Sequence, residues 1–269
     1  MKKNKLKVHD FWNKSSCGED LYLKGSTLKE SFINESRDRY KLEPYILNFA
    51  EFNNYKNKKV LEIGLGLGAD HQKFAESGAN LFGIDLTEKS LMHVRNRLKI
   101  FNLKSKISLG DAEKLIFEDD FFDLVYSWGV IHHSPKTEDA IDEIYRVLKK
   151  GSEAKIMIYN KYSLVGFMLW IRYSMFTLNF SITLDEIYSK YLESPGTKAY
   201  TKNQAFELFK KFKEVKIKTV LTHADLLSSK AGQRHEGFIL SVARILYPRF
   251  IIKIIFKNFG LFMIINAVK

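Results

Sequence analysis

The sequence is poor in cysteine, and Cys17 is the only one among its 269 residues. A single thiol excludes an internal disulfide framework and any zinc site with several cysteine ligands. We therefore expect a reducing, cytoplasmic environment. Cys17 itself is expected to be a small packing residue rather than a reactive one.

Long apolar runs are also missing. No stretch of 18 uncharged apolar residues occurs, because Arg172 interrupts residues 164–180 and lysines interrupt the C-terminal apolar stretch. The lysine-rich residues 1–7 are followed by a mixed segment rather than an apolar one. The sequence thus predicts neither a membrane-spanning helix nor a secretory signal.

The composition is that of a globular protein, with 45% hydrophobic, 14% aromatic and 28% charged residues. The formal net charge is +12. Such an excess favours phosphates, anionic lipid surfaces or acidic small molecules as partners.

Short apolar strands alternate with amphipathic helices along the chain. Strands are expected at residues 58–63, 81–84, 106–109, 122–127, 154–159, 215–221 and 260–268. Helices are expected between them at residues 69–77, 88–101, 137–148 and 201–212. This alternation predicts an α/β fold with a doubly wound, mostly parallel sheet covered on both faces.

We expect one domain over residues 1–269, because no repeat or low-complexity linker divides the chain. Residues 1–54 are predicted to form an N-terminal extension with a helix over 36–52, and residues 55–160 a cofactor-binding core. Residues 161–200 are predicted to form a lid insertion. Residues 201–269 are predicted to form the C-terminal part of the fold, which contains a second insertion over 223–259.

Three glycines, Gly64, Gly66 and Gly68, directly follow the first strand. Glycines there let a ligand approach the backbone, and the helix that follows offers free amides. The second strand ends in Asp85, where a carboxylate can bind ribose hydroxyls. With Ala69, the turn satisfies both G-x-G-x-G and the dinucleotide form G-x-G-x-x-A, so it predicts a nucleotide-like ligand without choosing between the two.

Other residues favour one ligand. Glu62 precedes the turn and suits a cationic ligand group better than a pyrophosphate. Asp111 and Ala112 follow the third strand, and Phe122–Val125 and Glu143–Gly151 complete an ordered set of motifs. Over residues 55–160 the chain resembles the class I S-adenosylmethionine-dependent methyltransferases, in the small-molecule group that includes the ubiquinone and menaquinone biosynthesis enzymes.

This resemblance implies a seven-stranded sheet whose last strand is antiparallel, and S-adenosylmethionine as the cofactor. It assigns the methionine part to Glu62, Gly64, Gly66 and Gly68, the ribose to Asp85, and the adenine to Asp111 and Ala112. It also places Leu86 beside the adenine and Ser127 and Trp128 near the methionine end. The structural alternatives are a tight glycine turn and Asp85 as a helix cap.

His132 and His133 follow the fourth strand, at the sheet edge where ligands bind. They are the candidate catalytic bases for an oxygen acceptor, and the alternative is two polar residues that open a helix near Pro135. Related quinone O-methyltransferases hold a metal here with carboxylates and a histidine. This chain has Gly129 and His132 where acids would be expected, so we predict no metal.

A nucleic-acid substrate is not expected. Amino-group methyltransferases of bases carry an N-P-P-Y-like tetrad after the fourth strand, whereas this chain has Ser127-Trp128-Gly129-Val130. Cytosine-C5 enzymes need a cysteine at that edge, and Cys17 lies far outside the core motifs.

The two insertions are the expected acceptor determinants. Residues 164–180 are too apolar for a solvated loop and are expected to be buried. Arg249, Lys253 and Lys257 recur at i, i+4 and i+8 among apolar residues, and no acid follows Ser241. This pattern suits peripheral contact with an anionic membrane or a lipid-linked substrate. The alternative is a lid helix packed on the sheet with its lysines outward.

We therefore expect an enzyme that transfers a methyl group from S-adenosylmethionine to a small-molecule or lipid-linked acceptor at oxygen. Trp12, Asn13 and Tyr40 are candidates to close over the cofactor. Two alternatives stay open: an NAD-dependent oxidoreductase and a non-catalytic, membrane-associated binding protein. The oligomeric state is left open.

Overall fold

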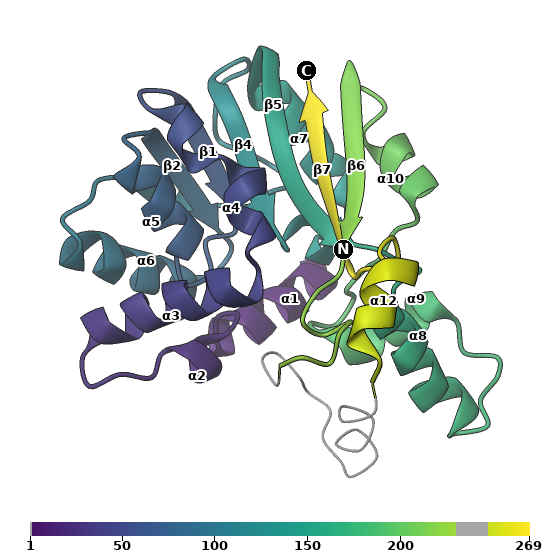
Figure 1. Cartoon of the computed structure of the whole chain (residues 1–269). Helices are drawn as coiled ribbons and strands as arrows, with labels where there is room; N and C mark the ends of the chain where they lie inside the picture. The colour runs from purple at the N-terminus through teal and green to yellow at the C-terminus, as the bar shows by residue number, and fades with distance from the viewer. Residues whose placement is uncertain (1, 230–246) are drawn as a thin grey trace.

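The computed structural model describes residues 2–229 and 247–269. Its centre is a seven-stranded sheet in the order β3-β2-β1-β4-β5-β7-β6 (Figure 1). Only β7 runs antiparallel to its neighbours, which confirms the predicted fold class. The strands are β1 (Lys59–Ile63), β2 (Asn80–Asp85), β3 (Lys106–Leu109), β4 (Phe122–Trp128), β5 (Leu148–Tyr159), β6 (Glu214–Val220) and β7 (Phe262–Val268).

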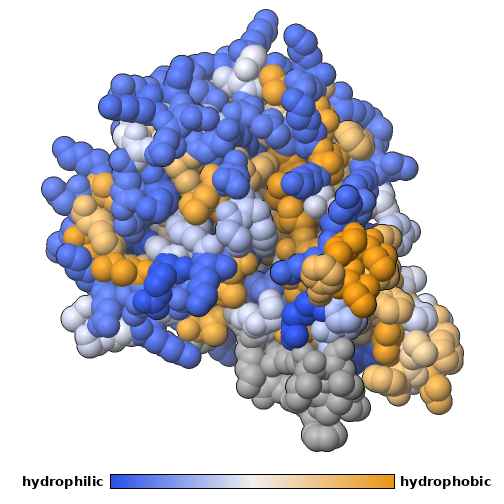
Figure 2. Space-filling model, in the orientation of Figure 1, coloured by the Kyte–Doolittle hydropathy of each residue, from blue (hydrophilic) through white to orange (hydrophobic). Residues whose placement is uncertain are grey.

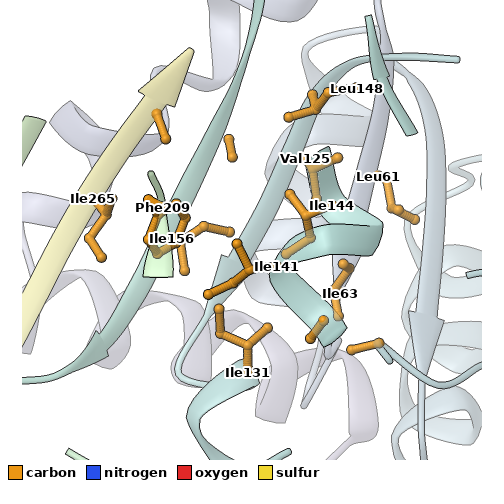
Figure 3. Close-up of a cluster of buried hydrophobic side chains, with 14 of the residues drawn as sticks. Leu61, Ile63, Val125, Ile131, Ile141, Ile144, Leu148, Ile156, Phe209 and Ile265 are labelled. Carbon is orange, nitrogen blue, oxygen red and sulfur yellow. The ribbon is translucent and has the colours of Figure 1, made fainter. Parts of the chain in front are cut away.

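Helices cover both faces of the sheet because successive strand residues point to opposite sides. Leu61 and Ile63 pack into one core cluster, whereas Val60 packs into another on the opposite face. Figure 3 shows the first cluster, in which Ile141 and Ile144 of α7 face the strands. The flanking helices are α5 (Ala69–Glu76), α6 (Glu88–Ile100), α7 (Thr137–Val147) and α10 (Lys202–Leu208).

The N-terminal segment folds as separate short helices, so the prediction of one helix over residues 36–52 is wrong. Pro44 lacks an amide proton and disfavours helical geometry at Glu43, which has φ −127° and ψ 57°. The chain therefore breaks there. The elements are α1 (Lys2–Lys14), α2 (Glu19–Tyr22), α3 (Leu28–Leu42), α4 (Tyr45–Ala50) and the 3₁₀ turn η1 (Phe52–Tyr55).

Residues 161–200 form a compact helical unit beyond the carboxyl ends of the strands (Figure 1). Val165 and Leu169 are buried, but Phe176 and Leu178 are exposed, so the expected burial of this apolar stretch is only partly met. The elements are α8 (Leu164–Trp170), the π-helical turn η3 (Ile171–Met175), α9 (Leu184–Ile187) and the π-helical turn η4 (Tyr188–Leu192). A 3₁₀ turn, η2 (Ile131–His133), follows β4.

In the second predicted insertion, residues 230–246, and with them Ser241, lie outside the described residues. The helix predicted around residues 249–257 is α12 (Arg249–Ile255). It does not pack as a lid on the sheet, since Ile252 is its only buried residue. None of the helices described is long and apolar enough to cross a membrane.

Candidate active site

A cavity of about 1130 Å³ opens at the carboxyl ends of β1, β2 and β4. This edge is where open α/β sheets bind ligands. Single-ligand pockets usually measure about 300–1,000 Å³, so this cavity lies just beyond the large end of that range. Its two ends differ: residues 62–69 and 85–87 line one, which we call the cofactor half, and residues of β5, α8 and η4 line the other, the acceptor half.

The glycine turn forms the wall of the cofactor half. Gly64, Gly66 and Gly68 have φ of +80°, +54° and +84°, a backbone region that disfavours side chains. A Cβ on Gly64 would lie 2.2 Å from Val130, whereas a Cβ on Gly66 would meet nothing within 4 Å. Gly64 is thus required for packing, and Gly66 leaves an open cradle for a ligand.

Asp85 ties the glycine turn to the second strand. Its Oδ2 accepts a hydrogen bond from the Leu65 amide at 2.8 Å, and its Oδ1 accepts from the Thr87 amide and hydroxyl at 2.9 and 2.8 Å. The cap of α6 is Thr87 and not Asp85. Burial raises the pKa of Asp85, and these donors oppose the shift. Asp85 and Leu86 both line the cavity, and the Asp85 carboxylate also holds the turn; its predicted contact with a ribose stays a prediction.

Glu62 lines the cavity beside a buried histidine. Its Oε2 lies 2.9 Å from Nδ1 of His71, whose Nε2 lies 2.8 Å from the Ser105 hydroxyl. Ser105 donates its own proton to the Leu81 carbonyl, so it accepts from Nε2–H of His71. The proton between His71 and Glu62 therefore belongs to the carboxyl group.

Burial raises the pKa of Glu62 well above its usual range, with Asp70 as a further cause. It also lowers the pKa of His71 to about 3. Both shifts agree with a neutral acid paired with a neutral imidazole. A positively charged ligand group beside Glu62 would favour the ionised form of its carboxyl group. Glu62 therefore suits the protonated amino group of a methionine moiety.

The N-terminal helix α1 covers the predicted adenine end. Asp111 and Ala112 line the cavity there. Lys5 of α1 pairs with the carboxylates of Asp111 and Glu113, each at 2.5 Å. Trp12 also lines the cavity. Asn13 instead accepts a hydrogen bond from the Lys89 amide at 3.2 Å.

Of the two residues predicted at the end of β4, only Trp128 lines the cavity. Ser127 is fully buried, and its hydroxyl donates to the Ile63 carbonyl at 3.1 Å. Ser127 therefore supports the turn between β1 and the glycines without facing a ligand in this structure.

The two predicted histidines also lie in different surroundings. His133 lines the cavity and contacts Trp12, with ring centroids 5.4 Å apart. His132 is fully buried, does not line the cavity, and packs on Tyr159 at 4.1 Å. Burial, with the nearby His133, lowers the pKa of His132 well below its usual range. The geometry therefore favours His133 over His132 as a base.

A turn from the lid segment orients His133. Its Nδ1 lies 2.9 Å from the Ser194 hydroxyl and 3.1 Å from that of Thr197. Thr197 donates its proton to the Ser194 carbonyl at 2.7 Å, so towards His133 it can only accept. The Ser194 hydroxyl is free to donate to Nδ1, so the two hydroxyls hold the Nδ1 side of the ring and leave the Nε2 side facing Glu193.

Nε2 of His133 lies 3.3 Å from the Glu193 carboxylate. Tyr159 donates its hydroxyl proton to the same carboxylate at 2.6 Å. Glu193 and Tyr159 line the cavity and were not predicted. The turn at residues 194–200 is rich in hydrogen-bonding side chains, and this composition is the only signal that the sequence carries nearby.

Two further ionisable residues, Arg39 and Glu43, line the cavity without a sequence signal. Arg39 donates to both oxygens of Asp70, at 3.1 and 2.7 Å, and Tyr40 and Tyr126 donate to the same carboxylate. Tyr40 thus braces Asp70 and does not line the cavity. Burial raises the pKa of Glu43 to about 7, although Arg39 opposes the shift.

Ligand atoms of His132, His133 and Glu193 lie within 4.8 Å of one another, the one such group of at least three among the described residues. The prediction that no metal binds therefore stays a prediction. Cys17 is exposed and lines the cavity, so its expected role in packing is wrong.

Part of the chain is similar to known proteins. A family model described as a methyltransferase domain matches residues 61–155. The phosphoethanolamine N-methyltransferase 2 of Caenorhabditis elegans is 36% identical over 113 residues, which cover 41% of this chain and 26% of that protein. The sterol 24-C-methyltransferase ERG6 of Saccharomyces cerevisiae is 31% identical over 123 residues, or 42% of this chain and 32% of that protein. The chain thus spans no more than about a third of these relatives.

Among solved structures, the Haemonchus contortus phosphoethanolamine N-methyltransferase 2, in complex with phosphomonomethylethanolamine and S-adenosylhomocysteine, has a TM-score of 0.62 at 18% identity. The match covers 97% of this chain and 60% of that one. At this identity the likeness shows the fold. None of these matches supports the oxidoreductase or the non-catalytic binding protein. Residues 61–155 therefore match a methyltransferase domain, and the chain around them has the fold of a solved methyltransferase structure.

Proposed function

We propose that this protein transfers the methyl group of S-adenosylmethionine to a hydroxyl oxygen of an apolar small-molecule or lipid-linked acceptor. The observation that carries the choice of oxygen is the orientation of His133. Its Nδ1 is held by Ser194 and Thr197, its Nε2 lies 3.3 Å from the Glu193 carboxylate, and both His133 and Glu193 line the cavity. Bound S-adenosylmethionine supplies an electrophilic methyl group.

The apolar character of the acceptor follows from the wall of the acceptor half. One apolar cluster supplies most of that wall. Its cavity-lining members include Met157, Val165, Met168, Leu169, Leu261 and Phe262. An apolar acceptor gains free energy by leaving water for such a surface.

The protein's own groups then manage the proton. An attacking hydroxyl loses its proton as it becomes positively charged, and the His133–Glu193 pair at the cavity wall is the group proposed to accept it. The Glu193 carboxylate stabilises the resulting imidazolium, and Tyr159 holds that carboxylate in place by its hydrogen bond. Ser194 and Thr197 keep the ring from rotating.

A second candidate is an amine acceptor. It is favoured by the carboxyl groups of Glu43 and Glu193, which both line the cavity and would attract a cation. The printed names of the relatives concern nitrogen and carbon acceptors. They support a small-molecule acceptor without selecting the atom.

The test is a methyl-transfer screen with S-adenosylmethionine labelled on its methyl group, using lipid and polar cell fractions separately. We expect a labelled O-methyl ether in the lipid fraction. His133→Gln should lower kcat by about 10²–10⁴-fold, the usual contribution of general base catalysis, without changing the Kd for S-adenosylmethionine.

His9→Gln is the matched control, because His9 pairs with Asp10 outside the cavity, and it should keep full activity. A labelled N-methyl or C-methyl product whose formation does not need His133 would refute the oxygen assignment. Absence of transfer from both fractions would refute the activity.

A further inference from the structure

Two segments of the chain expose an unusual set of large apolar side chains. The first is the lid segment around α8 and η3. Its exposed members are Phe167, Met175, Phe176, Leu178 and Phe180, and Leu178 is 78% exposed. Residues 164–183 contain no acid, and Arg172 is their only base.

The second segment is α12 with the residues after it. Its exposed members are Phe250, Ile251, Ile254, Ile255, Phe256 and Phe259, and Phe250 is 77% exposed. Figure 2 shows hydrophobic surface over α12 and over the tip of the lid segment. We call these two sets of residues together the apolar surface. Soluble proteins rarely leave such large side chains grouped in water, so grouped exposure marks an interaction site.

The structure holds α12 with its apolar side outward. The guanidinium of Arg249 turns inward and donates to the carbonyls of Leu226 and Leu227, both at 3.0 Å. Lys253 and Lys257 remain exposed among the apolar side chains. The predicted stripe of three cations is therefore a stripe of two.

The two segments are fixed to one another. The amide of Leu164 donates to the Phe259 carbonyl at 2.9 Å. Asp225 accepts from the amides of both Val165 and Leu261, at 3.2 and 2.8 Å. These hydrogen bonds join the start of α8 to the end of the α12 segment, so the two parts of the apolar surface are held together.

The apolar surface also borders the cavity. Arg172 and Phe176 belong to the lid segment and line the cavity, and Phe176 is 68% exposed. A molecule that contacts the lid segment from outside therefore reaches the rim of the acceptor half.

We propose that the apolar surface docks on an anionic lipid membrane and that the acceptor enters the cavity from that membrane. Charge selects this occupant: residues 247–261 carry Arg249, Lys253 and Lys257 but no acid, and the net charge is +12. A second copy of the chain would bring like charges together, whereas anionic headgroups complement them. Entry of the acceptor rests on the proposed function, but docking does not.

The experiment is sedimentation of the full chain with vesicles of phosphatidylcholine alone or mixed with phosphatidylglycerol, at low and at physiological salt. We expect binding to the anionic vesicles only, weakened by salt. Lys253→Gln with Lys257→Gln should weaken binding about thirtyfold, from about 1 kcal/mol per cation near the surface. Phe250→Ser with Ile254→Ser should weaken it at least tenfold.

Two matched controls should bind like the wild type. Lys56→Gln with Lys58→Gln removes the same charge from exposed positions just before β1, at the amino-terminal end of that strand and so opposite the cavity. Ile116→Ser with Met92→Ser removes exposed apolar side chains outside the apolar surface. Circular dichroism checks that each variant is folded.

Equal losses in the surface variants and the controls, or no binding by the wild type even at low salt, would overturn the proposal. A concentration-dependent dimer that Phe250→Ser with Ile254→Ser abolishes, without vesicle binding, would assign the surface to a second copy. Binding of S-adenosylmethionine, measured by calorimetry on the same variants, should not change. A failure of docking is therefore distinguishable from a failure of the proposed methyl transfer.

Discussion

The two halves of the cavity are built in different ways. The cofactor half comes largely from residues 62–69 and 85–87, which lie at the ends of neighbouring strands and bond to one another through backbone amides and Asp85. The acceptor half combines residues from distant segments, such as Tyr159 of β5, Leu169 of α8 and Leu192 of η4. Rigid backbone therefore forms the first half, and packed side chains form the second.

The largest effect on stability should come from a glycine in the cofactor half. Gly64→Ala adds a Cβ that would lie 2.2 Å from Val130, at a φ of +80°. We expect a loss of about 3 kcal/mol of unfolding free energy from overpacking and backbone strain together, measured by urea denaturation.

Gly66→Ala is the matched control, because its Cβ meets nothing within 4 Å. Only the φ of +54° is unfavourable, so the loss should be about 1–2 kcal/mol. It should weaken S-adenosylmethionine binding, since the new methyl occupies the cradle. Equal destabilisation by both changes would show that the turn is not packed as described.

At Glu43, on the cavity wall outside the glycine turn, the effect on stability should depend on pH. The pKa of Glu43 is about 7 in the folded protein, against an ordinary value of 4.5. As pH rises, the Glu43 carboxyl group loses its proton near pH 4.5 in the unfolded chain but only near pH 7 in the folded protein. The stability that protonated Glu43 contributes is therefore fully present below pH 4.5 and is lost as pH rises through 7.

Glu43→Gln should therefore stabilise the protein by up to about 3 kcal/mol at pH 8 and by little at pH 4.5, since one pKa unit corresponds to about 1.4 kcal/mol. Unfolding curves at the two pH values test this. The exposed Glu138→Gln is the control and should show no such difference. Destabilisation at pH 8 would mean that the pairing of Glu43 with Arg39 outweighs its burial.

A smaller effect on stability, with a clear effect on binding, is expected for Asp85→Ala. The change removes the acceptor of the Leu65 and Thr87 amides and, on our assignment, of the ribose hydroxyls. Hydrogen bonds to a charged group contribute about 1.5–3 kcal/mol, so S-adenosylmethionine should bind ten- to hundredfold more weakly.

Calorimetry with Asp85→Ala and the milder Asp85→Asn measures this loss, and urea denaturation should show a decrease of about 1–3 kcal/mol in stability. An unchanged Kd for S-adenosylmethionine in a folded Asp85→Ala variant would mean that Asp85 supports the glycine turn but does not bind the ribose.

The same contrast explains what the sequence could predict. The positions of the strands and the nearness of Asp85 to the glycine turn follow from local patterns, because the carboxyl ends of parallel strands meet at one edge. Glu193 and Tyr159 reach His133 only through the packing of the lid segment, which has no period or motif of its own. Ser127 was placed on the correct strand, but the sequence did not show on which side its hydroxyl lies.

Local patterns also fail where one residue changes the backbone or the direction of a helix. Pro44 divides the predicted helix over residues 36–52, although its effect on the preceding residue is general. In α12 the spacing of Arg249, Lys253 and Lys257 predicted that all three cations share one exposed face. Arg249 instead turns inward and donates to the carbonyls of Leu226 and Leu227. Such partners exist only in the folded chain.

The pairing of α1 with Asp111 has a consequence for synthesis on the ribosome. Lys5 and Asp111 are separated by 106 residues, and Ser16 reaches Ser90 across 74. The helix that covers the cofactor half is thus made long before its partners, and it can dock only after β3 has emerged. Because such distant contacts form late, the nascent domain passes through a stage in which its glycine turn is present but uncovered.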